Sequence, residues 1–115
     1  MIKTHAEMER EVRQKMRGGQ GSVEIVHIFR PQELKGKVRL MAHLRLEKGS
    51  SIGFHVHEGE EEVFYILRGA GMVSEGAEPR RVTAGDAVLT GGGAGHAIEN
   101  PGDEPLEFMA TILTY

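Results

Sequence analysis

The sequence predicts an all-β domain that folds as a sandwich or barrel. About ten short β-prone segments follow one another along the chain, each bounded by a turn-prone segment. Glycine supplies 16 of the 115 residues, which suits a chain with many tight turns between its strands. A helical pattern is confined to the first residues, and the length corresponds to one domain with one hydrophobic core.

The composition excludes several classes of protein and partner. No cysteine is present, which rules out disulfides and thiolate chemistry. The N-terminal residues lack the apolar segment of a signal peptide, and no apolar run is long enough to span a membrane. The net charge is −3 and no basic stripe stands out, so nucleic acid is not an expected partner. We therefore expect a cytoplasmic protein without a membrane or nucleic-acid partner.

The first residues are compatible with two structures. Thr4 and Glu7 have the spacing of a capping box, and apolar residues recur at every fourth position, which favours a short helix: Met8, Val12 and Met16. The segment 12–17 also alternates, which would suit an extended arm that pairs with another subunit. We expect an N-terminal arm over 1–20 that is either a short helix or an extended segment.

A barrel domain over 21–115 should follow the glycine-rich turn at 18–21. In the segment 38–46, every second residue is apolar and should face the interior, which leaves Arg39 and His43 on the outward face. Further strands are expected over these segments: 23–29, 52–57, 62–67, 72–74, 80–83, 87–90, 96–99 and 106–115.

Two histidines form the start of a metal site. His55 and His57 lie two residues apart, so a strand places both imidazoles on one face. Glu62 opens the next strand and can meet them if the two strands are neighbours, and His96 follows a glycine-rich turn. Imidazoles and a carboxylate on one rigid surface suit a divalent metal ion. The alternative is a set of structural histidines with a surface carboxylate. Two further acidic residues of the intervening turn are expected to be solvated: Glu58 and Glu60.

These residues belong to two motifs that resemble those of the cupin superfamily, in particular the small single-domain microbial cupins. The first motif is matched by Gly49, His55, His57, Glu62 and Gly69. The second is matched by Gly85, Gly93, His96 and Asn100, with Gly91 in the place of the usual proline. The resemblance implies a double-stranded β-helix, or jelly-roll, barrel with a metal bound inside it. The spacing to Gly69 selects Glu62 rather than Glu61 as the fourth ligand.

The resemblance also implies a cofactor and a range of functions. The cofactor is one divalent ion, with manganese placed before iron, nickel and zinc. The first function is that of a metal-dependent enzyme, such as an oxalate-decarboxylase-like lyase, a dioxygenase or an isomerase, acting on a small oxygen-rich substrate with a carboxylate or enol. The alternatives are a binding or sensing module without turnover and a storage-like barrel. Oxalate decarboxylases carry an arginine three residues before the first ligand histidine, where this chain has Ile52. Neither a carboxylate-binding arginine nor a general base is evident.

The pocket and the assembly can also be predicted. Four apolar residues near the ligands are expected to line a dry pocket: Phe54, Phe64, Ile66 and Ile98. The glycine-rich loop over 91–95 should be mobile and act as an entrance flap. The strand that begins at Glu62 is apolar on its second face as well, so we expect a homodimer that covers this face, with a contribution from the arm.

Overall fold

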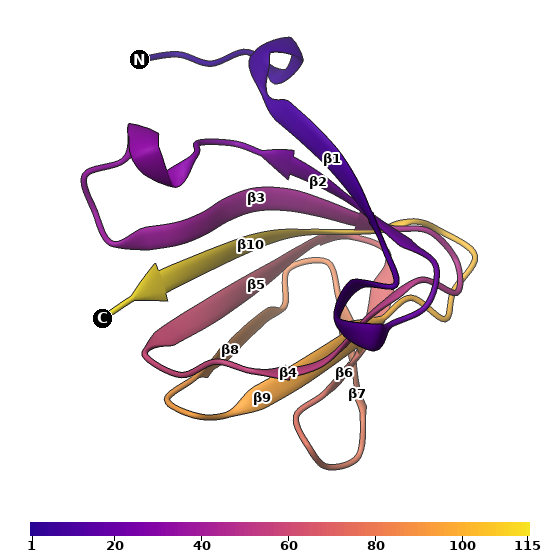
Figure 1. Ribbon diagram of the computed structural model, residues 1–115. Helices are drawn as coiled ribbons and strands as arrows, with labels where there is room; N and C mark the ends of the chain where they lie inside the picture. The colour runs from indigo at the N-terminus through magenta and orange to yellow at the C-terminus, as the bar shows by residue number, and fades with distance from the viewer.

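Two antiparallel sheets face each other in the computed structural model, which describes all residues 1–115. Figure 1 shows the sheets as two layers with both chain ends on the same side of the view. The six-stranded sheet consists, in spatial order, of β1 (Glu9–Gln14), β2 (Ser22–His27), β3 (Val38–Leu46), β10 (Leu106–Thr114), β5 (Glu60–Arg68) and β8 (Ala87–Gly91). The four-stranded sheet consists of β4 (Ser51–Val56), β9 (Gly95–Glu99), β6 (Ala70–Ser74) and β7 (Arg80–Thr83). The predicted all-β barrel is confirmed.

The N-terminal segment is mostly extended. Thr4 and Glu7 interact as a capping box, but the turn η1 (His5–Glu7) ends at once and β1 follows. The helix suggested by Met8, Val12 and Met16 is therefore wrong. A short isolated helix is marginal in water, whereas β1 pairs along its whole length with β2 of the same chain. Two other single turns are η2 (Met16–Gly18) and η3 (Pro31–Glu33), and no helix is long and apolar enough to cross a membrane.

The core fills the space between the two sheets. The predicted inward face of β3 is confirmed by Ala42, Leu44 and Leu46, which are almost fully buried. β5 and β10 add Phe64 and Phe108, whose rings meet edge to face with centroids 4.8 Å apart. Burial of each large apolar side chain contributes about 1.5–3 kcal/mol, so this layer fixes how the sheets face each other.

Three register shifts interrupt the pairing of the strands, and two of them change which side chains face the interior beside the candidate site. Between β3 and β10, Ile112 lies opposite Leu40 and Leu113 lies opposite Val38, so β3 has one extra residue, Arg39. Between β4 and β9, Ile52 lies opposite Ile98 and His55 lies opposite His96, so β4 also has one extra residue. Such bulges turn a side chain away from the direction that simple alternation gives it. Both bulges lie beside the candidate site.

The remaining motif residues have structural roles. The Asn100 side chain donates hydrogen bonds to the carbonyls of Leu46 (2.9 Å) and Glu104 (2.8 Å) and accepts one from the Gly102 amide (3.0 Å). Gly69 has φ +79°, and a Cβ there would lie 2.4 Å from the Pro105 carbonyl oxygen. Only glycine fits this left-handed position. The two motifs therefore define the barrel as well as the ligands.

Candidate metal centre

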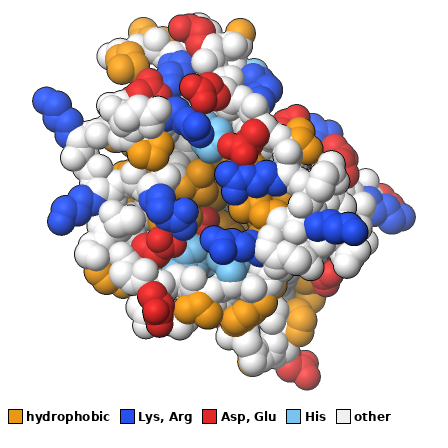
Figure 2. Space-filling view, viewed as in Figure 1, with side chains coloured by type: hydrophobic (Ala, Val, Ile, Leu, Met, Phe, Trp, Pro, Cys, Tyr) orange, Lys and Arg blue, Asp and Glu red, His pale blue; other side chains and the backbone are white.

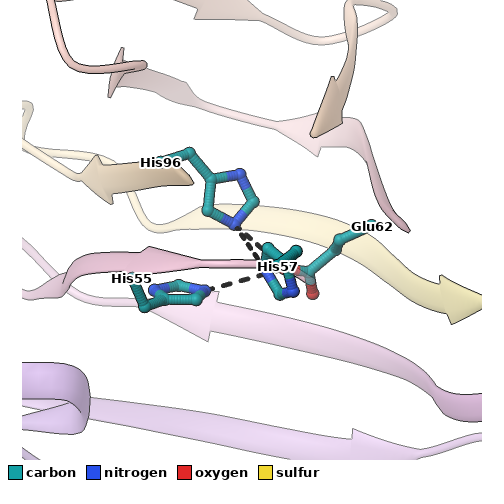
Figure 3. Close-up of side chains that lie close together, drawn as sticks. All are labelled: His55, His57, Glu62 and His96. Atoms are coloured by element: carbon teal, nitrogen blue, oxygen red, sulfur yellow. Dashed lines mark hydrogen bonds and ion pairs between the residues drawn. The ribbon is translucent and has the colours of Figure 1, made fainter. Parts of the chain in front are cut away.

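Three histidines and one glutamate converge inside the barrel (Figure 3). The pairing of β4 with β9 places His55 opposite His96, and His57 follows directly after β4. Glu62 reaches the same point from β5 in the facing sheet. One nitrogen or oxygen atom of each side chain lies within 4.8 Å of the corresponding atoms of the others. These four residues are those expected from the sequence, and they form a group that could hold a metal ion.

The donor atoms face one another at short range. His57 Nε2 and His96 Nε2 lie 3.2 Å apart, and each lies 3.0 Å from Glu62 Oε1. His55 Nε2 lies 3.9 Å from the same oxygen. His57 and His96 are 2% and 1% exposed, so both imidazoles are withdrawn from bulk solvent. Buried nitrogen lone pairs around one carboxylate oxygen suit a shared cation.

Hydrogen bonds outside the group fix the orientation of two imidazoles. His55 Nδ1 lies 2.8 Å from the Gly53 carbonyl oxygen, which can only accept, so Nδ1 carries the proton and Nε2 is left with its lone pair. His57 Nδ1 lies 2.5 Å from Glu60 Oε2, with the same consequence for its Nε2. A ring held in this way is typical of metal-ligating histidines.

The charge of Glu62 also suits a cation. Burial raises the pKa of the Glu62 carboxyl, but the imidazoles of His55 and His96 outweigh burial and hold that pKa below its ordinary value. Glu62 is therefore a carboxylate at neutral pH. The donor set is three imidazoles and one carboxylate, which fits manganese, iron, nickel and zinc alike.

Glu60 was expected to be solvated because it lies in an acidic turn, but its carboxylate is hydrogen-bonded within the protein. Its carboxylate accepts two hydrogen bonds from Arg39, at 2.9 and 2.8 Å, in addition to the bond from His57. The Arg39 guanidinium holds the pKa of Glu60 at about 2. The prediction failed because Arg39 was assigned to the outward face of β3, and the bulge turns it toward β5. Glu58 is exposed, as expected.

Glu60→Gln is expected to weaken metal binding by roughly ten- to a hundredfold, the usual effect of losing a carboxylate that orients a histidine ligand. The amide keeps the shape of the side chain but lacks the charge that holds the His57 proton. Glu58→Gln is the matched control and should leave the affinity unchanged. Competition with a chelating dye measures both variants, and equal affinities would contradict the orienting role of Glu60.

A cavity of about 310 Å³ opens above this group. Figure 2 shows it as a hollow with histidines at its side, apolar side chains at its floor and basic side chains around its rim. His55, His57 and Glu62 line it together with the apolar residues Leu40, Leu44, Ile52 and Phe64. Four arginines also line it: Arg13, Arg17, Arg30 and Arg39.

Sequence reasoning found no arginine for a carboxylate, and the cavity has four. Arg13 lies on β1, Arg17 in η2, Arg30 before η3 and Arg39 on the bulge of β3. All four lie outside the two motifs, and only the pairing of β1, β2 and β3 brings them to one rim. His27, which the sequence left without a role, also lines the cavity, with its Nε2 atom 2.6 Å from Glu11 Oε2. No local pattern in the sequence signals any of these placements.

The expected pocket residues take different positions. Phe64 lines the cavity, and its ring stacks on His96 with centroids 4.7 Å apart. Phe54 is 51% exposed and does not line it, because Phe54 is adjacent to His55 and points to the opposite face of β4. Ile66 and Ile98 are buried in the core and do not line it either. Ile52 lines the cavity instead.

The glycine-rich loop over 91–95 does not form part of the cavity wall. Two backbone hydrogen bonds attach it to His57, from the His57 amide to the Ala94 carbonyl (3.0 Å) and from the Gly93 amide to the His57 carbonyl (2.8 Å). The expectation of an entrance flap at this loop is wrong, since the residues at the cavity rim come from β1, η2 and β3. The loop supports the ligand segment.

Comparison with known proteins gives consistent matches. Residues 42–112 match the family described as "Cupin domain". An oxalate-binding protein of Thermotoga maritima is 41% identical over 113 residues, which cover 98% of this chain and 93% of that protein. An uncharacterised protein of Methanocaldococcus jannaschii is 33% identical over 89 residues, or 77% of this chain and 70% of that protein. The crystal structure of a predicted oxalate decarboxylase from Thermotoga maritima superposes with a TM-score of 0.94 at 40% identity and covers 100% of both chains.

Proposed function

The chain belongs to the cupin family, and on this premise we propose that it binds one divalent metal ion and, at that ion, a small dicarboxylate. The ligands of the metal are His55, His57, Glu62 and His96, with manganese placed before iron, nickel and zinc. The observation that carries the proposal is the cavity itself, in which this group lies below a rim of four arginines.

The charges around the cavity favour an anion. Guanidinium groups bind carboxylates through paired hydrogen bonds, and four of them line this cavity. Carboxylates of the protein lie beside Arg13, Arg30 and Arg39, whereas Arg17 has no such partner. A volume of about 310 Å³ lies at the lower end for ligand pockets and suits a small molecule. The relative from Thermotoga maritima is named an oxalate-binding protein, which supports the same ligand class for this chain.

The residues of this chain would have distinct tasks. A bound metal would supply Lewis-acid polarisation and positions at which a carboxylate can chelate. Glu60 and the Gly53 carbonyl hold His57 and His55 in the required tautomer. Phe64, Ile52 and Leu40 exclude water from part of the wall and so strengthen the electrostatic contacts of the ligand. The arginines orient the carboxylate oxygens that face away from the metal-binding group.

The second candidate function is that of a metal-dependent lyase, dioxygenase or isomerase. Four protein ligands would leave coordination positions open for a substrate, which favours this candidate. Binding without turnover is placed first because no free general base faces the cavity. His27 is bonded to Glu11, and Glu60 is bonded to Arg39.

Reconstitution of the metal-free protein separately with manganese, iron, nickel and zinc distinguishes binding without turnover from catalysis. Each form is incubated with dicarboxylates, enediols, flavonols and keto-sugars while ligand binding, product formation and oxygen uptake are followed. We expect saturable binding of dicarboxylates and no consumption of them. Metal-dependent consumption would establish the enzyme instead, and binding of only uncharged compounds would contradict the ligand class.

We also propose a homodimer that covers the outer face of the six-stranded sheet. On this face, Tyr65 and Leu67 of β5 are 46% and 45% exposed, and Leu89 of β8 is 63% exposed. Val63 lies opposite Leu89 and continues the same apolar surface. Exposed apolar surface of this kind is typical of an interface.

Light scattering at micromolar concentration is expected to give a dimer for the wild type and a monomer for Leu67→Glu. The substitution places a charge on the apolar face, where a dimer would have to bury it unpaired. Val56→Glu is the control, since Val56 is 53% exposed on β4 in the other sheet and should not change the mass. A wild-type monomer would contradict the dimer.

A further inference from the structure

The four arginines of the cavity differ in their partners. Arg39 is bound by Glu60, Arg13 by Glu11 at 2.7 Å, and Arg30 lies 3.3 Å from Glu9. The Arg17 side chain has neither a salt bridge nor a hydrogen bond within the protein, although it lines the cavity together with His55. Its charge is therefore available to a ligand. Arg13 and Arg39 are hydrogen-bonded to carboxylates, and Arg30 has Glu9 beside it, although the buried Arg30 Nε atom makes no hydrogen bond.

The backbone at Arg17 is held in an uncommon conformation. Lys15 and Arg17 both have positive φ, 48° and 54°, in the left-handed region that residues with side chains rarely adopt. Such conformations persist where the surroundings enforce them, and they concentrate at functional positions. The backbone of η2 is therefore strained, and this strained conformation sets the position and direction of the Arg17 Cα–Cβ bond.

Close contact between η2 and β4 enforces this conformation. A Cβ on Gly53 would lie 2.0 Å from the Arg17 carbonyl oxygen, and one on Gly19 would lie 2.2 Å from the Ser51 carbonyl oxygen. The Ser51 side chain accepts a hydrogen bond from the Gln20 amide at 2.8 Å. The backbone of Arg17 therefore lies directly against the strand that carries His55, with Met16 packed against the core beside it.

From this arrangement we propose that Arg17 binds the carboxylate group that points away from the metal centre and so selects dicarboxylates over monocarboxylates. The inference rests on the proposed function and names the residue that determines its specificity. Arg17 lies N-terminal to residues 42–112, which match the cupin family, so the selectivity comes from a segment outside that region. A dicarboxylate held at His55, His57, Glu62 and His96 would direct its outer oxygens toward the cavity wall that Arg17 lines.

Arg17→Met tests the inference in manganese-loaded protein. Oxalate affinity should fall roughly ten- to a hundredfold, the usual effect of losing a hydrogen-bonded charge. Affinity for glycolate, in which a hydroxyl replaces one carboxylate, should fall less than affinity for oxalate, because glycolate lacks the second carboxylate group. Arg17→Lys should restore part of the oxalate affinity, and manganese affinity should be unchanged in both variants. Arg45→Met is the matched control, because Arg45 pairs with Glu47 at the surface and does not line the cavity.

Isothermal titration calorimetry measures these affinities, and each outcome decides a different point. Unchanged oxalate affinity in Arg17→Met would overturn the role of Arg17 and leave the proposed function intact. Equal losses for oxalate and glycolate would show that the residue only supports the cavity, which also overturns it. Absence of oxalate and glycolate binding by the wild type would overturn both the proposed function and the inference.

Discussion

Wild-type protein is expected to retain one metal ion on purification, and the double variant His55→Ala/His96→Ala is expected to lose it. The double variant removes two of four donors and leaves His57 and Glu62, so the affinity should fall by at least about a hundredfold, more than changes to outer residues cause. Elemental analysis of protein purified without an affinity tag measures the metal content. The affinity of the wild type for the metal should also decrease as the pH is lowered, because protons compete with the metal for the imidazoles.

Two controls make this result specific. His43→Ala should keep the metal, because His43 lies on β3 with its Nε2 atom 3.0 Å from Glu107 and away from the group. Glu61→Gln should lower the metal content far less than Glu62→Gln does, since only Glu62 belongs to the group of four. Stoichiometric metal in the double variant would contradict the site, and the opposite ranking of the two glutamates would show that the wrong carboxylate was assigned.

Phe108→Ala is expected to lower the free energy of unfolding by about 3–5 kcal/mol, the usual cost of removing a buried phenylalanine. Phe108 is fully buried and contacts the Phe64 ring, which in turn stacks on His96. The cavity left behind would remove the support of this stack as well as apolar contacts.

Denaturant unfolding of the metal-free protein at fixed protein concentration measures this effect, because bound metal and association would shift the apparent stability. Tyr115→Ala is the control, since Tyr115 is 68% exposed and the change should stay within about 0.5 kcal/mol. A Phe108→Ala variant as stable as the wild type would contradict the account of the core.

The elements that depend on local spacing could be predicted from the sequence. Alternation within one strand predicts that His55 and His57 share a face. The resemblance to the two cupin motifs adds Glu62 and His96 to the set. The inward face of β3 from Ala42 to Leu46 follows from the same alternation.

The features that depend on long-range pairing could not be predicted. The bulge at Arg39 arises from the register of β3 against β10, and the sequence gives no sign that Arg39 pairs with Glu60. Arg13 and Arg17 reach the cavity only because β1 pairs with β2 in the same chain. The positive charge at the rim, on which the choice of ligand depends, is therefore a property of the folded chain.

The most direct test of the central claim is a calorimetric titration of oxalate into wild-type protein with and without bound manganese. The arrangement of the four ligands below the arginine rim predicts one oxalate site per chain in the loaded protein and none after the metal is removed by a chelator. Equal binding by the loaded and the metal-free protein, or no binding by the loaded protein, would contradict it.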